Sequence, residues 1–229
     1  EVANQKVTID GQGHEFKGSV QINGKSDYNK ATTVFENINF VSEDASALVN
    51  GDSFIYCGTL NGNTQVRYPD NIIVKNCTFT ATGNTAVGVK VWSLDHGQLV
   101  IEGGKADGVH SLLQVTSSQG ANILVDGVEV VNAKNGISLG NAGNTAIKNS
   151  TISTAEYGIR ANGDSNAADL TIENSTITAT QPVIVRKLTK AGYVLNIDAA
   201  TTLNTAEKYA VVFTKGSDDA AYVLPEVEF

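Results

Sequence analysis

The chain has 229 residues, of which 41% are hydrophobic and 17% charged, and its formal net charge is −8. The apolar fraction is enough for a core, while 22 Gly, 22 Asn and 22 Thr argue against a helical fold. The chain holds no Lys/Arg run for nucleic acid binding and no apolar stretch of membrane-spanning length, so neither partner is predicted.

The first residues, Glu1 to Asn4, show neither the basic nor the apolar region of a signal peptide, and the sequence contains no Met. We therefore expect a chain cut from a longer precursor or excised as a domain. The acidic balance is typical of soluble proteins in an extracellular, cell-surface or virion setting, which is the localisation we predict.

A short pattern recurs along the chain. An apolar anchor ends an alternating segment, and Asp, Glu or Lys follows, then Asn or Gly (Ala in the last copy). The anchors are Ile9, Phe35, Val74, Ile101, Val125, Ile147, Ile172 and Ile197, at spacings of 26, 39, 27, 24, 22, 25 and 25 residues. Asn and Gly tolerate positive φ, so each pattern predicts a strand followed by a sharp bend.

Two further strands are predicted after each bend. The second is exemplified by Cys77–Phe79 and Ser175–Ile177, and the third by Val89–Val91 and Ile159–Ala161. Three short strands per repeat describe one coil of an all-β parallel solenoid, and about eight coils give a rod of roughly 40 Å. A β-sandwich does not give such a repeat, and the consensus of leucine-rich repeats is missing.

The repeat resembles the right-handed parallel β-helix of the pectin lyase-like superfamily over nearly the whole chain. The resemblance implies the handedness and says little about activity, because that fold hosts lyases, glycosidases, adhesins and phage tailspikes. We expect a single domain over residues 1–229, with an inserted loop at 51–70 and a terminal coil or cap at 209–229. No amino-terminal capping helix is predicted, so more chain or another subunit is expected to cover Val7 to Ile9.

Outward positions of the third strands form a polar strip that carries the only Trp of the sequence. An aromatic face suits sugar C–H groups, while amides and cations suit hydroxyls and carboxylates, so an acidic glycan is a candidate ligand. The alternative is an ordinary solvated sheet face. The strip residues are Gln21 and Asn23, Lys90 and Trp92, Gln114 and Thr116, Ser138 and Gly140, Arg160 and Asn162, and Ile184 and Arg186.

The predicted inserted loop supplies further candidates. Tyr56, Arg67 and Tyr68 form our hypothesis for a ligand or subunit contact, since loops often carry function. Packing of Phe54 and Tyr56 over a neighbouring coil is an equally weighted alternative.

The segment from Val91 to His96 is similar to the Trp-Ile-Asp-His stretch of pectate lyases. An extra residue before Asp95 moves Asp95 and His96 to the other strand face. Such lyases need a calcium-binding carboxylate cluster and a basic residue, for which Lys90 and Arg160 are candidates. The nearest carboxylates, Asp95 and Asp107, lie in different turns, so no cofactor is predicted and calcium enters only if the chain is a lyase.

Polygalacturonases of this fold use neighbouring Asp residues with a His-containing loop. Here Asp107 and His110 share one turn, but a second carboxylate across a cleft is missing. The sequence has one Asp-Asp pair, Asp218–Asp219, and it lies in the tail. A polar turn is the favoured interpretation of Asp107 to His110.

Two structural expectations complete the sequence analysis. Cys57 and Cys77 do not form a disulfide framework; Cys77 is expected to be a buried thiol, with pairing left open. Asn37, Asn76, Asn149 and Asn174 occupy equivalent bends, where stacked side chains are expected to form a ladder.

The sequence therefore favours a non-catalytic β-helix module of a surface, secreted or virion protein that contacts glycans or subunits. The first alternative is a polysaccharide lyase or glycosidase acting on acidic glycans, with Lys90, Arg160, Asp95, Asp107 and His110 as catalytic candidates. The second is a purely structural spacer or decoration protein. A polysaccharide or cell-surface glycan, a second copy of the chain, or a larger chain or assembly are the partners that we consider.

Overall fold

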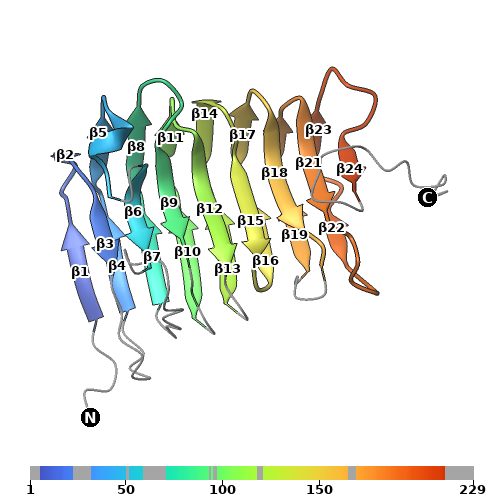
Figure 1. Cartoon of the computed structure of the whole chain (residues 1–229), viewed down its shortest axis with the longest axis horizontal. Helices are drawn as coiled ribbons and strands as arrows, with labels where there is room; N and C mark the ends of the chain where they lie inside the picture. The colour runs from blue at the N-terminus through green and yellow to red at the C-terminus, as the bar shows by residue number, and fades with distance from the viewer. Residues whose placement is uncertain are drawn as a thin grey trace, which may run out of the picture.

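A computed structural model describes residues 6–22, 32–49, 52–58, 71–92, 94, 97–117, 121–164 and 169–214. Within these ranges the chain forms 24 β-strands and one 3₁₀ turn, η1 (Ala45–Ala47). The strands build three eight-stranded parallel sheets, and each coil contributes one strand to each sheet. Figure 1 shows successive coils side by side along the long axis, which confirms the predicted all-β parallel solenoid.

The first sheet, sheet A, contains the predicted anchors. All eight anchors lie in one column, from Ile9 opposite Phe35 to Ile172 opposite Ile197. The column faces the core, because alternation along each strand points every second side chain inward. Its strands are β1 (Lys6–Asp10), β4 (Thr32–Glu36), β7 (Asn71–Lys75), β10 (Gln98–Glu102), β13 (Asn122–Asp126), β16 (Thr145–Lys148), β19 (Leu170–Glu173) and β22 (Leu195–Ile197).

The bend after sheet A has the predicted backbone. Asn37, Asn76, Asn149 and Asn174 have φ values of 54°, 49°, 49° and 45°. The Asn174 amide donates to Asn149 Oδ1 at 2.8 Å, and the Asn149 amide donates to Asp126 Oδ1 at 2.8 Å. Gly103 and Gly127 occupy the same position in the two middle coils, so the ladder is formed in part and is interrupted where these coils lack an amide.

The second sheet, sheet B, follows that bend. Phe40 and Phe79 stack in its inner column with ring centroids 5.3 Å apart, and Phe54 of the third sheet packs against both rings. Its strands are β2 (Glu15–Lys17), β5 (Asn39–Ser42), β8 (Thr78–Ala81), β11 (Lys105–Asp107), β14 (Glu129–Ala133), β17 (Thr151–Thr154), β20 (Thr176–Thr178) and β23 (Thr202–Asn204).

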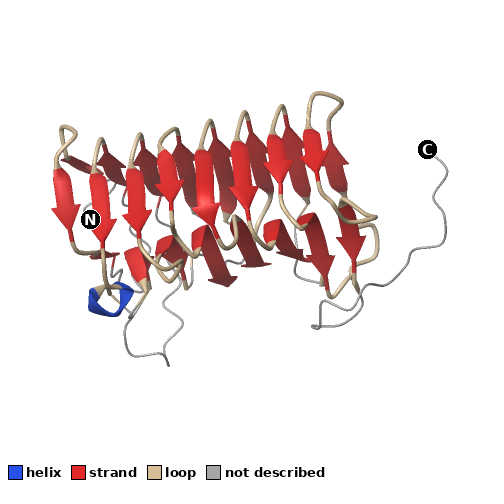
Figure 2. Ribbon diagram, turned by 90° about the horizontal axis from the view of Figure 1, so that it is seen from above, coloured by secondary structure: helices blue, strands red, loops and turns tan. Residues whose placement is uncertain are grey.

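The third sheet, sheet C, closes each coil and brings the chain back toward sheet A. Figure 2 shows the strands of successive coils stacked along the rod in all three sheets. The strands of sheet C are β3 (Val20–Ile22), β6 (Ser53–Cys57), β9 (Val87–Val91), β12 (Ser111–Ser117), β15 (Ile137–Asn141), β18 (Tyr157–Asn162), β21 (Gln181–Arg186) and β24 (Val211–Phe213).

Strand β6 corrects the prediction of an inserted loop over 51–70. Residues Ser53–Cys57 form the sheet C strand of the second coil, where they pair with β3 and β9. Every residue of β6 is buried, and three of them, Phe54, Ile55 and Cys57, pack into the core. The prediction is therefore wrong for this part of the segment, and residues 59–70 lie outside the described residues.

Candidate functional site

The outer face of sheet C carries the polar strip that the sequence predicts. Backbone pairing places one residue from each coil in a single column, called column 1, with a spacing of about 4.8 Å between coils. The predicted members lie in register, and Tyr56 joins them because β6 is a strand. Column 1 consists of Gln21, Tyr56, Lys90, Gln114, Ser138, Arg160, Ile184 and Val212.

A second column lies two residues further along each strand. This column 2 contains Gly58, Trp92, Thr116, Gly140, Asn162 and Arg186, and Asn162 lies directly opposite Arg186. Trp92 is 37% exposed, which makes it one of the few large exposed hydrophobic residues among those described. A Cβ added to Gly58 would lie 2.8 Å from the Trp92 Cβ, so the glycine makes room for the indole side chain.

Lys90 is not a free cation. Its Nζ lies 2.5 Å from Asp52 Oδ2, and the two side chains are only 13% and 30% exposed. Asp52 is held at the start of β6, where its carbonyl accepts a hydrogen bond from the Val87 N–H at 2.6 Å. The ion pair balances the Lys90 charge, which weakens Lys90 as a ligand for an anion or as a catalytic base.

Tyr56 lies beside this ion pair and is only 3% exposed. Burial, and to a smaller extent the negative charge of Asp52, raises the pKa of the Tyr56 phenol. Tyr56 lies on a strand and not in a loop, so its burial favours the alternative in which it packs over a neighbouring coil. The other two loop candidates, Arg67 and Tyr68, lie outside the described residues, as does Asn23 of the strip.

Arg160 is the central cation of column 1. Its guanidinium lies 5.3 Å from the centroid of the Tyr157 ring on the same strand, within the range of a cation–π interaction. Lys90 and Arg160 are separated by three strand spacings, or about 14 Å along the rod. One small ligand therefore cannot contact both cations, whereas an extended chain that follows the rod axis can.

The strip is not uniformly accessible. Ile184 and Val212 occupy outward positions in column 1, yet they are only 1% and 8% exposed. Gln114, Ser138, Arg160 and Asn162 are half-buried, and Thr116 is exposed. The accessible polar part of the strip therefore runs from β9 to β18, with Arg186 of column 2 at its far end.

His110 lies at the bend between sheets B and C. Its pKa is lowered first by burial and then by the nearby charge of Lys134, while Glu156 and Asp52 act in the opposite direction. Lys134 Nζ pairs with Glu156 at 3.4 Å. Burial therefore favours the neutral imidazole over the charged form, at a position between two ion pairs, Asp52–Lys90 and Lys134–Glu156.

The structure separates Asp107 from His110. Asp107 lies on the outer face of sheet B, where it accepts a hydrogen bond from the Asn132 amide at 2.9 Å and pairs with Lys105 at 3.5 Å. The bend after Gly108, with φ of 66°, turns the chain before His110. The acid and the imidazole therefore do not form an acid/base pair, and the candidates Asp95 and His96 lie outside the described residues.

Asp52 and Glu156, the two carboxylates beside His110 at the B–C bend, are spaced too widely for paired hydrolysis. Asp52 and Glu156 lie at equivalent positions four coils apart, or about 19 Å, and each is already bound to a lysine. Two cooperating carboxyl groups need a separation below about 10 Å. Within the described ranges there is no group of three or more His, Cys, Asp and Glu residues with metal-binding geometry.

Both thiols are free and buried. The buried position predicted for Cys77 is confirmed, and the two cysteines do not pair. Burial raises the pKa of Cys57 to about 12 and also raises the pKa of Cys77, so neither native thiol is an activated thiolate at neutral pH.

The structure also shows a groove on sheet A that the sequence reasoning missed. It has a volume of about 420 Å³ and is lined by Gln98, Asn122, Asn144 and Asp169, with Leu124 and Ala146 beside them. The sequence feature that could have indicated this groove is an amide side chain three residues before the anchor in four successive coils. These residues are Asn71, Gln98, Asn122 and Asn144.

No family model, no curated protein and no solved structure matched the chain. Among the residues that the structure describes, no helix has the length and apolar character needed to cross a membrane.

Proposed function

We propose that the protein is a non-catalytic recognition module that binds an acidic glycan chain along the outer face of sheet C. The observation that carries the proposal is the strip itself, in which Trp92, Arg160, Asn162 and Arg186 lie in register on one face. An indole for sugar C–H faces, an amide and guanidinium groups for hydroxyls and carboxylates are the groups that such a ligand needs.

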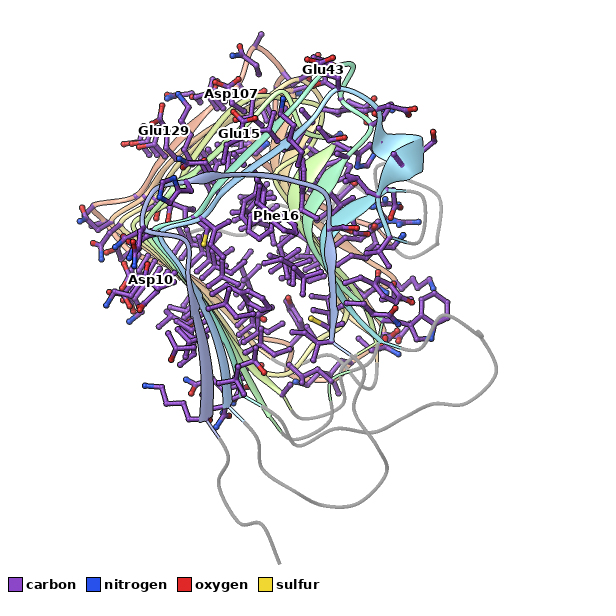
Figure 3. All side chains as sticks on the ribbon, turned by 90° about the vertical axis from the view of Figure 1, so that its left-hand side faces the viewer. Asp10, Glu15, Phe16, Glu43, Asp107 and Glu129 are labelled. Carbon is purple, nitrogen blue, oxygen red and sulfur yellow. The ribbon has the colours of Figure 1, made fainter. Side chains whose placement is uncertain are left out.

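The distribution of charge supports an anionic ligand on this face. The bend between sheets A and B carries a column with six carboxylates and two lysines, formed by Asp10, Glu36, Lys75, Glu102, Asp126, Lys148, Glu173 and Asp198. Because each coil runs from A through B to C, this acidic corner lies across the coil from sheet C, as the position of Asp10 in Figure 3 indicates. This column has a net charge of −4, half of the formal net charge of −8, and it lies away from Arg160 and Arg186.

The spacing of the strip supports a polymer. Trp92 and Arg186 are four strand spacings apart, or about 19 Å, so only a ligand of several sugar units contacts both. The paired state of Lys90 and the separation of Asp107 from His110 favour recognition over bond cleavage. A surface or virion protein of the right-handed pectin lyase-like superfamily is the biological setting that we propose for this module.

Binding to arrayed acidic and neutral glycans, followed by titration with the best polyuronate, tests the proposal. The Arg160→Gln change removes one charge from the strip, and we expect about a tenfold loss of affinity. The matched control is Lys75→Gln, which removes an ion-paired cation from the acidic corner and is expected to leave the affinity unchanged. Equal effects of the two changes, or no binding by the wild-type protein, would overturn the proposed site.

The same samples distinguish the enzymatic alternative. Absorbance of unsaturated products and release of reducing ends are followed during incubation with uronic glycans. Robust turnover that disappears on the Arg160→Gln change would make the protein a lyase or glycosidase and would refute the non-catalytic function.

A further inference from the structure

The exposed hydrophobic residues gather at the two ends of the rod. Val7, Ile9 and Phe16 belong to the first coil and are 41% to 54% exposed, while Val194 and Tyr209 belong to the last coil. Among the described residues, Trp92 is the one large hydrophobic residue of comparable exposure between them. In the part of the chain that the structure describes, the sides of the rod are therefore well covered, whereas the first and last coils expose apolar side chains.

The first coil exposes core residues. Val7, Ile9 and Phe16 lie opposite Thr33, Phe35 and Phe40 in columns that face the interior. Phe35 and Phe40 are fully buried by the coils on both sides, whereas Phe16 has a neighbour on one side only, with its ring 5.5 Å from that of Phe40. Figure 3, which looks along the rod from this end, shows Phe16 inside the ring formed by the three sheets.

The same end presents three open backbone edges. Strands β1, β2 and β3 are the first members of their sheets, and each pairs with one described strand, on one side. Edges of this kind are strong acceptors for another parallel strand. To pair the free backbone N–H and C=O groups of all three edges at once, a partner must present three short strands in the same triangular arrangement, with apolar side chains pointing into the space between them.

The last coil is such a partner. Strands β22, β23 and β24 are the final members of the same three sheets, and they are also paired on one side among the described strands. Their inward residues Leu195, Ile197, Leu203 and Val211 pack only partly against the core. These residues stand in the columns that begin with Val7, Ile9, Phe16 and Val20 at the other end.

We propose that the protein associates head to tail with a second copy of itself, with β22, β23 and β24 of one copy pairing in parallel with β1, β2 and β3 of the next. In this arrangement Leu195 covers Val7, Ile197 covers Ile9 and Leu203 covers Phe16, so the core columns continue from copy to copy. The contact is heterologous, and the assembly therefore grows into open linear oligomers. It is independent of the glycan strip, which the arrangement leaves on the side of the rod.

One contact between the copies is repulsive, and it makes the association depend on ionic strength. Column register places Asp198 of one copy beside Asp10 of the next, and both are exposed carboxylates. Hydrogen bonds keep both groups charged, since Gln12 and Asn37 donate to Asp10, and Thr201 and Asn174 donate to Asp198. Salt screens this repulsion while it strengthens apolar contacts, so association increases with ionic strength.

Sedimentation velocity of the full chain at rising concentration tests the proposal with two blocked variants. Phe16→Glu blocks the first end and Leu203→Glu blocks the last end. We expect the wild type to form oligomers, each variant alone to stay monomeric, and an equal mixture of the two to form dimers and nothing larger. The control Thr151→Glu, on the exposed face of sheet B, is expected to associate like the wild type.

A cross-link makes the test independent of those core changes. In the double variant Glu15→Cys/Thr202→Cys, the two new thiols belong to one outward column of sheet B. Across the junction, the thiol at position 202 of one copy lies one strand spacing from the thiol at position 15 of the next copy, which is within reach of a disulfide. Oxidation is expected to give covalent ladders, whereas Glu15→Cys/Thr176→Cys, which is one coil out of register, is expected to give none. A wild type that stays monomeric at high concentration and high salt, or equal cross-linking of the two double variants, would overturn the proposal.

Discussion

At the scale of single residues, two factors restrict which residues fit at the bends: the left-handed backbone conformation and the close approach of neighbouring coils. The close approach is the stronger restriction. Gly104 and Gly83 have φ of 83° and 77°. A Cβ at Gly104 would lie 2.0 Å from the Cys77 carbonyl oxygen, whereas a Cβ at Gly83 would meet no atom within 4 Å. The two glycines therefore separate the cost of the backbone conformation from the cost of contact.

We predict that Gly83→Ala lowers the free energy of unfolding by about 1 kcal/mol, the cost of the left-handed conformation for a residue with a Cβ. Gly104→Ala is expected to lower it by about 3 kcal/mol or more, because neighbouring backbones must also move apart. Urea unfolding followed by circular dichroism measures both values. Equal losses would show that the contact with Cys77 has no role.

Buried acidic groups predict an alkaline limit to stability. Burial raises the pKa of Cys57 from 9.0 to about 12 and, with the charge of Asp169, that of Tyr193 from 10.0 to about 12. The unfolded chain releases the Cys57 proton around pH 9 and the Tyr193 proton around pH 10, while the native chain retains both up to about pH 12. Stability is therefore full below pH 9 and falls between pH 9 and 12, by up to about 1.4 kcal/mol per pH unit for each group.

The variant Cys57→Ala isolates the thiol contribution. Between pH 9 and 10, before tyrosine ionises, its unfolding free energy is expected to fall less steeply than that of the wild type. Thermal and urea unfolding across this pH range provide the measurement. Parallel curves for the two proteins would contradict the buried, protonated state of Cys57.

At the scale of elements, the strands that a sequence can predict are those with a local signature. Anchors such as Val125 and Ile172 are found from three consecutive residues, since the alternation and the bend residue are adjacent in the chain. Strand β6 lacks that signature, because Phe54, Ile55, Tyr56 and Cys57 form an unbroken apolar run that is buried on both faces.

The candidate site was predicted in the same uneven way. Column 1 follows from alternation, so Lys90, Gln114 and Arg160 could be placed on one face. The Asp52–Lys90 pair could not, because it joins residues 38 positions apart and depends on β6. Nor could the separation of Asp107 from His110, which depends on where the chain bends between sheets B and C.

The aromatic stack gives a prediction for elements β5, β6 and β8. Phe79 is buried between Phe40 and Phe54, so Phe79→Ala is expected to cost about 3–5 kcal/mol of unfolding free energy. Phe16→Ala, the same change in the same column at the open end, is expected to cost about 1 kcal/mol in the monomer. Chemical unfolding at low protein concentration compares them, and similar costs would contradict the packing described for the first coil.

At the scale of the whole molecule, a solenoid is a sum of neighbouring coils, which makes whole coils removable. Deleting residues 123–144 removes β14, β15 and all of β13 except Asn122, and it brings β16 beside β10 with every column preserved. We expect a folded rod shorter by about 4.8 Å, measured by X-ray scattering and circular dichroism. Deleting only 123–133 brings a sheet C strand into a sheet A position and is expected to unfold the chain; equal behaviour of the two deletions would refute the modular description.

The most direct test of the proposed function uses Trp92, the single Trp of the sequence, as a reporter on sheet C. Its fluorescence is followed during titration with a polyuronate, and the length of the glycan is measured in the same samples. We predict a saturable change in Trp92 emission. Only glycans of several sugar units or more are expected to cause this change, and the glycan is expected to stay intact. Two results would contradict a non-catalytic recognition surface on sheet C. One is unchanged Trp92 emission at a glycan concentration at which the protein binds the glycan by another measurement, and the other is shortening of the glycan.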